Sequence, residues 1–298
     1  MDWQGHPGAS VEVDRLIRLR GLAQSALPRL AETGRPGSHA GRKRGSGLDI
    51  RDIRPYSDGD DIRYMDAMAT ARTGKPHVRT FHEDQDRTAM LVVDFRHSML
   101  WGTRGRLRSV LAAELAALAG WRMLAAGGRV GLLAFSDRDS VYQPPRERDT
   151  AMVRIAGSLA HAHRQALAAL AAGDRAPGVG LDIHMDRVAR LVPRGASVVL
   201  ATGLDDGENG VEQAVRPLLR LARLEIFLIR DAFERDPPNR NLPYFTEDGT
   251  LRWGAFAQDK DAAERRVQAL RDLGAAVRVV DADTVLEDMA GDLYADAV

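Results

Sequence analysis

From residue 89 onward, short apolar runs alternate with longer amphipathic segments, and this alternation constrains the fold more than any other sequence feature. The first run, Ala89-Met-Leu-Val-Val-Asp94, has the length of a buried parallel strand and ends on an acid. Strands of this kind are expected at 89–94, 129–135, 196–201, 224–229 and 276–280. Helices are expected at 107–126, 150–172, 183–192, 210–221, 258–273 and 284–294. The pattern predicts an α/β fold with a doubly wound, mostly parallel sheet and helices on both faces.

The regions outside this alternation divide the chain further. Residues 12–32 carry a helical apolar pattern followed by a run rich in glycine and arginine, so 1–46 is interpreted as a helix and a basic, Gly-rich linker. A charged segment fills 47–88, and the α/β domain is expected over 89–298. A β-hairpin insertion is predicted at about 241–256, because two strand-like runs flank Asp248-Gly249, a strong turn signal.

The composition excludes several classes of function. The chain has no cysteine, which rules out disulfides, thiolate zinc sites and a cysteine nucleophile and favours a cytoplasmic location. Lys plus Arg and Asp plus Glu number 42 each, so no net charge attracts the protein to nucleic acid. No apolar run reaches the roughly 18 to 20 residues that span a bilayer, and no transmembrane segment is expected.

The charged segment carries a pattern of fixed residues. In chain order they are Asp49, Arg54, Tyr56, Gly59, Asp60, Asp61, Arg63, Asp66, Arg72, Arg79 and Glu83. This spacing resembles that of domain of unknown function 58 (DUF58), a family of bacterial von Willebrand factor A-like proteins whose members accompany MoxR-type AAA+ ATPases. One departure is Ala67, where the family usually has tryptophan. The resemblance covers residues 47–135 closely and the remainder more loosely.

The resemblance implies a metal site at the carboxyl ends of the strands, where open α/β sheets bind ligands. Related integrin-type domains hold Mg²⁺ through Asp-x-Ser-x-Ser, a threonine on a second loop and an aspartate on a third. This chain keeps Asp94 and Ser98 but has Arg96 in place of the first serine. The other two positions fall at Val179 and at Thr202-Gly203, where the resemblance leads us to expect threonine and Ser-Asp.

These replacements predict a degenerate metal site. Mg²⁺ requires oxygen ligands at about 2.0–2.1 Å, which a guanidinium cannot supply. We therefore expect no metal and no other cofactor, with Arg96 paired to Asp94 in place of the ion. The alternative is a Mg²⁺ site of altered arrangement, held by Asp94 and Ser98 with the acids of the third loop, Asp205 and Asp206.

No catalytic residue is expected. His97 lies in the first loop, but no nucleophile with a defined geometry stands beside it, and Ser98 lacks a Gly-x-Ser-x-Gly elbow. His161 and His163 are two apart on a predicted helix, which aims them in different directions and predicts ordinary surface histidines. An enzyme that uses His97 and Asp94 is the less favoured alternative.

The sequence thus predicts a non-enzymatic interaction adaptor. The resemblance alone implies that it works with a MoxR-type AAA+ ATPase in maturing or activating a client protein. A metal- or cofactor-containing dehydrogenase, such as methanol dehydrogenase, is the client class it points to, and the client itself is unknown. The charged segment is expected to form either a paired clamp against the first strand or a docking surface, and the sequence leaves both open.

Overall fold

The computed structural model describes residues 8–25, 50–57, 60–81, 87–173, 179–203, 210–245, 250–255 and 260–289. The chain divides into two compact units, a small one formed by 29–86 and a larger one formed by 1–28 together with 87–298. The small unit is therefore inserted into the sequence of the larger one. The N-terminal helix, which the sequence analysis placed in a region of its own, belongs to the larger unit.

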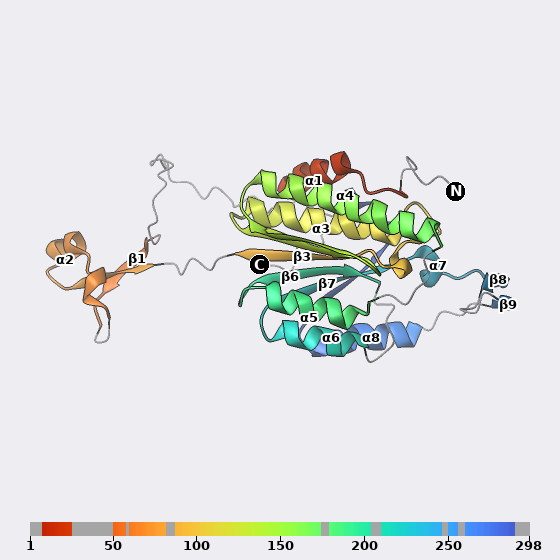
Figure 1. Ribbon diagram of the computed structural model, residues 1–298. Coiled ribbons are helices and arrows are strands. Elements are labelled where there is room, and N and C mark those ends of the chain that lie inside the picture. Colours follow the sequence, from red (N-terminus) through yellow and green to blue (C-terminus); the bar gives the residue numbers. More distant parts are fainter. Residues whose placement is uncertain are drawn as a thin grey trace. The chain divides into compact units, whose positions relative to one another are not determined.

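A six-stranded sheet forms the centre of the larger unit (Figure 1). Its strand order is β10-β7-β6-β3-β4-β5. Its strands are β3 (Thr88–Asp94), β4 (Arg129–Phe135), β5 (Ser140–Arg146), β6 (Ser197–Thr202), β7 (Arg223–Arg230) and β10 (Ala276–Asp281). Neighbouring strands are parallel except for β5, which pairs antiparallel with β4. The prediction of a mixed α/β fold with a mostly parallel sheet is confirmed.

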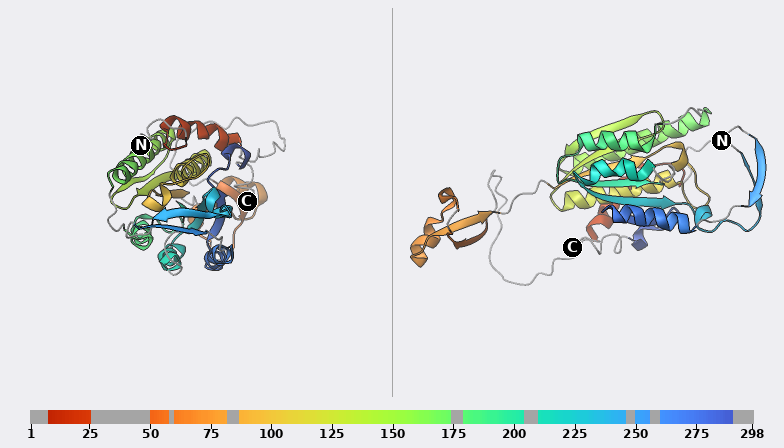
Figure 2. Two further views of the ribbon diagram at one scale, coloured as in Figure 1. Left: turned by 90° about the vertical axis from the view of Figure 1, so that its right-hand side faces the viewer. Right: turned by 90° about the horizontal axis from the view of Figure 1, so that it is seen from below.

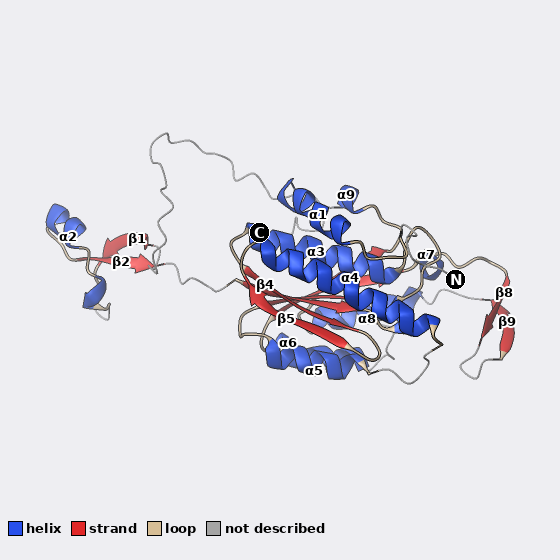
Figure 3. Ribbon diagram, turned by 45° about the horizontal axis from the view of Figure 1, so that its top comes forward, coloured by secondary structure: helices blue, strands red, loops and turns tan. Residues whose placement is uncertain are grey.

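Helices cover both faces of this sheet, as the view along the sheet in Figure 2 shows. They are α1 (Val13–Ser25), α3 (Arg108–Ala125), α4 (Asp149–Ala171), α5 (Leu181–Leu191), α6 (Gly210–Leu219) and α8 (Lys260–Asp272). Helices α1, α3 and α4 pack on one face, and α5, α6 and α8 pack on the other. Figure 3 shows the strands of the sheet between these helices.

The central strand β3 contributes to the apolar cores on both faces. Successive side chains of a strand point to opposite faces of its sheet. Leu91 and Val93 accordingly join the core beneath α1, α3 and α4, while Met90 and Val92 join the core beneath α5, α6 and α8. Because both faces are covered, β3 is a continuous apolar run instead of an alternating one.

The sequence analysis does not predict the edge strand β5. Its residues are half-buried or exposed and include Pro144 and Pro145, which cannot donate to a strand ladder and are tolerated at a sheet edge. The pairing with β4 shifts register beside Gly131, where an added Cβ would lie 2.9 Å from the carbonyl oxygen of Gln143. Glycine is needed at position 131 because the backbone of β5 lies too close to leave room for a side chain.

The remaining elements of the larger unit follow the expected order. The predicted hairpin insertion consists of β8 (Asn241–Phe245) and β9 (Leu251–Ala255), paired antiparallel. A short helix, α7 (Ala232–Arg235), follows β7 and was not predicted. Of the last expected helix, the structure describes α9 (Leu286–Met289). Among the described residues, no helix combines the length and apolar character needed to cross a lipid bilayer.

Helix α1 is attached to α3 by packing and by one buried hydrogen bond. Its side chains Leu16, Leu19 and Ala23 are buried in the core that α3 and α4 share. The indole N–H of Trp121, on α3, donates to the carbonyl oxygen of Leu16 at 2.9 Å. Since burial of one large apolar side chain is worth about 1.5–3 kcal/mol, this packing makes α1 an integral part of the larger unit.

The charged segment folds into the small unit. β1 (Ile50–Pro55) pairs antiparallel with β2 (His77–Phe81), and between them lie the 3₁₀ turn η1 (Ile62–Tyr64) and the helix α2 (Ala67–Thr73). The carboxylate of Asp66 caps α2 by accepting from the N–H of Ala69 at 2.8 Å. Gly74 ends the helix in the left-handed region, at a φ of 71°.

The attachment of α1 is tested by replacing Trp121 with phenylalanine. The variant loses the buried hydrogen bond to Leu16 and replaces the two-ring indole by the smaller ring of phenylalanine. We therefore expect the free energy of unfolding to fall by about 1–3 kcal/mol. The matched control is Trp253→Phe on β9, whose side chain is 66% exposed and whose replacement is expected to cost no more than about 0.5 kcal/mol. Urea unfolding followed by circular dichroism measures both, and equal losses would contradict this description of α1.

Candidate functional site

The carboxyl ends of three neighbouring strands meet in the middle of the sheet. β3 ends at Asp94, β4 ends at Phe135 and β6 ends at Thr202. From β3 the chain extends the sheet first through β4 and β5 on one side and then through β6, β7 and β10 on the other. Open α/β sheets bind ligands where the winding reverses in this way, so the side chains at this edge are the first candidates for function.

Asp94 is fully buried and forms an ion pair with Arg96. Nη2 of Arg96 lies 2.8 Å from Oδ2 of Asp94, and Nε lies 3.0 Å from Oδ1 and 3.2 Å from Oδ2. The backbone N–H of Arg96 also donates to Oδ1, at 2.9 Å. The ion pair expected from the sequence is therefore present, with the two-nitrogen geometry that makes arginine–carboxylate pairs strong.

Thr202 supplies one further donor to the same carboxylate. Its hydroxyl donates to Oδ2 of Asp94 at 2.7 Å, and the threonine itself is fully buried. Both oxygens of Asp94 thus accept hydrogen bonds from protein donors. A divalent ion needs a shell of oxygen ligands. The residues as arranged do not fit Mg²⁺ at Asp94, because a guanidinium occupies the coordinating side of the carboxylate.

Aromatic rings from β4 and α5 border this ion pair. The guanidinium carbon of Arg96 lies 5.8 Å from the ring centroid of Phe135, within cation–π range. His184, on α5, stacks on Phe135 with the ring centroids 4.0 Å apart. Burial lowers the pKa of His184 to about 4, an effect that the charge of Asp94 opposes and that of Arg96 reinforces. The imidazole is therefore neutral at pH 7.

A second ion pair fixes the loop that follows β3. Nη1 of Arg108 lies 2.9 and 3.1 Å from the two carboxylate oxygens of Glu234, and Nη2 donates to the carbonyl oxygen of Ser98. Glu234 also accepts from the backbone N–H of Asp231 at 2.6 Å, and Asp231 accepts from the backbone N–H of Thr103 at 2.9 Å. These contacts tie the loop to the end of β7 and leave it little freedom to move.

The loop after β3 contains His97, the residue considered as a general base. His97 and Ser98 lie in the 3₁₀ turn η2 (His97–Met99), and the side chain of His97 is exposed. The backbone N–H of His97 donates to Oδ2 of Asp137 at 2.6 Å. An imidazole that acts as a general base lies within hydrogen-bond distance of the group that it deprotonates. In the described part of the site, no nucleophile is paired with His97.

The second and third loops add no described metal ligand. Val179 and Gly203 are half-buried at the ends of these loops, and neither offers a side-chain oxygen. The acids Asp205 and Asp206, the alternative ligands on the third loop, lie outside the described residues. Within the described ranges, no group of three or more His, Asp or Glu side chains is placed to hold a metal ion.

The signature residues of the small unit form ion pairs and helix caps. Arg54 holds Asp60 through two nitrogens, at 2.8 and 2.6 Å. Asp61 caps η1 by accepting from the backbone N–H of Arg63, whose guanidinium it also binds. Both carboxylates have lowered pKa values, chiefly because of hydrogen bonds from these arginines. Of the other signature residues, Asp66 caps α2, Tyr56 is half-buried and Arg72 is exposed. Arg79 lies on β2, and its side chain is outside the described part. The remaining three, Asp49, Gly59 and Glu83, lie outside the described residues.

The same Asp-x-Arg arrangement therefore occurs at two places among the described residues. In Asp61-x-Arg63, Nη2 lies 2.7 Å from Oδ2, Nε lies 3.1 and 3.0 Å from the two oxygens, and the backbone N–H donates to Oδ1 at 3.0 Å. Asp94-x-Arg96 makes the same set of contacts. The guanidinium-bearing side chain is 85% exposed in Arg63 and 8% exposed in Arg96. The two pairs share their geometry and differ in their surroundings, which bury one of them.

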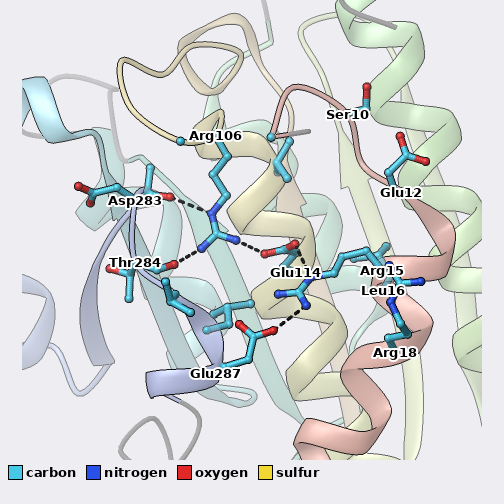
Figure 4. Close-up of a pocket in the computed structure, with 16 residues that line it drawn as sticks. Ser10, Glu12, Arg15, Leu16, Arg18, Arg106, Glu114, Asp283, Thr284 and Glu287 are labelled. Atoms are coloured by element: carbon cyan, nitrogen blue, oxygen red, sulfur yellow. Dashed lines mark hydrogen bonds and ion pairs between the residues drawn. The ribbon is translucent and has the colours of Figure 1, made fainter. Parts of the chain in front are cut away.

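A cavity of about 480 Å³ lies beside α1 and is lined in part by the loop after β3 and by the segment after β10 (Figure 4). Four of its charged side chains form a network. Glu114 binds both Arg106 and Arg15, and Arg15 also binds Glu287 at 2.6 Å. Nε of Arg106 donates to the carbonyl oxygen of Ala282 at 2.8 Å. The network joins α1, α3 and the segment after β10, and its balanced charges indicate a structural role.

The structure corrects one expectation and adds one residue. His163, expected to be a surface histidine, is buried: its Nε2 lies 2.9 Å from the hydroxyl of Ser109, and its ring packs against Phe95. His161 is exposed, as expected. No sequence pattern singled out His184. Only the packing of α5 on β4 brings it to the ion pair, and no spacing along the chain could have shown this.

Comparison with known proteins gives one family match. The sequence profile of the family described as "Protein of unknown function DUF58" matches residues 52–243. Uncharacterized protein Rv1480 of Mycobacterium tuberculosis and uncharacterized protein Mb1516 of Mycobacterium bovis are each 36% identical to this chain over 110 residues, or 37% of this chain and 35% of theirs. The match thus spans about a third of the length of these curated relatives.

Among solved structures, a mutant of the PilB minor pilin from Streptococcus sanguinis is similar, with a TM-score of 0.40 and 13% sequence identity. The similarity covers 76% of this chain and 65% of that chain. A likeness of this degree carries no argument about the function of the present chain.

The buried ion pair is tested by replacing Arg96 with methionine. Asp94 would then be a buried charge without its cation, so we expect the free energy of unfolding to fall by about 3–5 kcal/mol. The double variant Asp94→Asn/Arg96→Met removes both charges and is expected to lose less. The matched control is Arg63→Met, which breaks the exposed copy of the arrangement and should leave the stability unchanged. Urea unfolding followed by tryptophan fluorescence reports on the larger unit through Trp101 and Trp121. Equal effects of Arg96→Met and Arg63→Met would contradict a burial-dependent role.

The neutral state of His184 predicts a pH dependence of stability. Its pKa of about 4 in the folded protein lies below the ordinary value of 6.5, so the unfolded chain binds more protons between these values. The stabilising contribution is complete above pH 6.5 and is lost as the pH falls toward 4. At pH 5 the loss is about 1–2 kcal/mol for His184 alone.

The variant His184→Phe keeps an aromatic ring on Phe135 but cannot be protonated. We expect it to reduce the fall in melting temperature between pH 7 and pH 5, while the exposed His161→Asn leaves that fall unchanged. Part of the fall is expected to persist in His184→Phe, because burial also lowers the pKa of His163 to about 4. A pH profile identical to that of the wild type would contradict the burial of a neutral imidazole beside Arg96.

Proposed function

The chain belongs to the DUF58 family, and on this basis we propose that it is a von Willebrand factor A-like interaction module and not an enzyme. At the carboxyl ends of its strands, the module would hold an internal ion pair where related domains hold Mg²⁺. The module would recognise a partner protein through shape, hydrogen bonds and charged side chains. We place it in the cytoplasm, where a chain without cysteine needs no disulfides.

The observation that carries this proposal is the occupied carboxylate of Asp94. Both of its oxygens accept from Arg96, and Thr202 donates to one of them. An integrin-type domain leaves the corresponding aspartate available to a metal that then grips a carboxylate of the partner. A site that already contains its own cation has no need of such a metal, and its carboxylate is not available as a general base.

We further propose that the partner is a MoxR-type AAA+ ATPase and that the pair matures or activates a client protein. This step rests on the family resemblance, which is an argument by association. The client class that it points to is a metal- or cofactor-containing dehydrogenase. The two-unit organisation is consistent with an adaptor, because the small unit and the larger unit each offer a separate surface.

The metal-free site predicts that divalent ions do not stabilise the protein. A site with a Kd of about 10 µM would raise the free energy of unfolding by about 2.7 kcal/mol at 1 mM ion. We expect melting temperatures in Mg²⁺, Mn²⁺ or Ca²⁺ to equal those in EDTA, for the wild type and for Asp94→Ala alike. A rise with Mg²⁺ that Asp94→Ala abolishes would instead support a Mg²⁺-dependent domain that uses Asp94 and Ser98.

The ATPase partnership is tested by affinity purification of the full chain from its native host, in the presence of a non-hydrolysable ATP analogue. We expect a MoxR-type AAA+ ATPase to co-purify and to bind again when the two purified proteins are mixed. Recovery of no AAA+ ATPase under these conditions would overturn the partnership. That result would not bear on the proposal of a metal-free site, which the melting temperatures with divalent ions test separately.

A further inference from the structure

The small unit has exposed apolar side chains concentrated in one short stretch. Ile62 is 66% exposed and Met68 is 83% exposed, and Tyr64 and Met65 between them are each about 40% exposed. The apolar side chains that the described part of this unit buries are those of Ala69 and Val78. The larger apolar groups are thus left on its surface, where such clusters mark binding sites for other proteins. Methionine suits such a surface because its flexible side chain adapts to a partner.

Basic side chains continue this surface along α2. Met68 and Arg72 are four residues apart and therefore lie on the same side of the helix. Lys75 follows directly after the glycine that ends α2. Asp60 and Asp61 neutralise Arg54 and Arg63, but within the described residues no ion pair is formed by Arg72 or Lys75. In the part of the small unit that the structure describes, two cations that form no ion pair therefore border the apolar stretch.

We propose that the stretch 62–68, continued by Arg72 and Lys75, is a docking surface for a protein segment whose apolar side chains are bordered by aspartate or glutamate. The charge of the surface selects this partner chemistry, because carboxylates of the partner can pair with Arg72 and Lys75. The exposed stretch spans the 3₁₀ turn η1 and the first residues of α2, a size that fits a peptide segment. The inference rests on the proposed role as an interaction module and assigns the contact to the small unit.

The test is photo-crosslinking of the full chain in its native host. p-Benzoylphenylalanine is placed at position 68, and crosslinked peptides are identified by mass spectrometry. We expect crosslinks to a partner peptide that carries Asp or Glu within a few residues of the crosslinked site. The charge reversal Arg72→Glu, added to the same protein, is expected to lower the crosslink yield about tenfold. Exchange of the mapped carboxylate of the partner for lysine should restore it.

The matched control lies on the larger unit, where Val153 and Arg154 are exposed neighbours on α4. Crosslinking from position 153 should give no specific partner, and Arg154→Glu should leave the yield from position 68 unchanged. Equal melting temperatures of the variants confirm that the exposed substitutions leave the fold intact.

Five results would overturn the inference: no crosslink above the level of position 153, crosslinks to lipid, crosslinks to a second copy, crosslinks within the same chain, or a yield that Arg72→Glu does not change. The outcome is separable from that of the proposed ATPase partnership. If the ATPase co-purifies but does not crosslink at position 68, the docking surface is wrong and the partnership stands. If an acidic segment of a protein other than the ATPase crosslinks with the expected charge dependence, the docking surface is supported independently of the ATPase partnership.

Discussion

The pairing of Asp94 with Arg96 is the interaction on which the carboxyl edge of the sheet depends. A carboxylate with no exposed surface at the end of the central strand requires a compensating positive charge and hydrogen bonds. Arg96 supplies both, and Thr202 supplies one more hydrogen bond from the neighbouring strand. The ends of β3 and β6 are thereby joined, and the edge can be closed over by Phe135 and His184 without leaving a charge unpaired.

This arrangement explains why the described strand ends, in a fold that places ligands there, carry an internal ion pair. The guanidinium lies where a ligand charge would otherwise be needed, and the pair Arg108–Glu234 fixes the loop beside it. Function is then expected from other surfaces of the chain. The small unit offers such a surface, since its charged residues are partly consumed by internal pairs and its larger apolar side chains remain exposed.

The small unit is inserted between two buried elements of the larger unit. The chain enters it after α1 and leaves it into β3, and both of these elements are buried in the larger unit. Each end of the insertion is therefore anchored by apolar packing, at Leu16 and Leu19 on one side and at the central strand on the other. The chain therefore connects the small unit to the larger unit at both ends of the insertion.

The sequence by itself determined the features that depend on local pattern. The continuous apolar run of β3 and the spaced apolar residues of α3 were enough to predict a mostly parallel sheet with helices, and Asp248-Gly249 was enough to predict a hairpin. The ion pair of Asp94 with Arg96 was also predictable, because an Asp-x-Arg loop closes on itself over two residues. The edge strand β5 was not, since its prolines and exposed residues have no strand pattern and its pairing with β4 is a long-range contact.

Only the tertiary structure decided which local arrangements are buried. Asp61-x-Arg63 and Asp94-x-Arg96 have the same contacts, yet the first lies in water and the second beneath packed rings. The burial of His184 and His163 likewise depends on helices that pack across the sheet, over distances in sequence that no periodicity encodes. The physical reason is that burial sums contributions from many distant segments, whereas hydrogen-bond geometry between near neighbours is set by the chain itself.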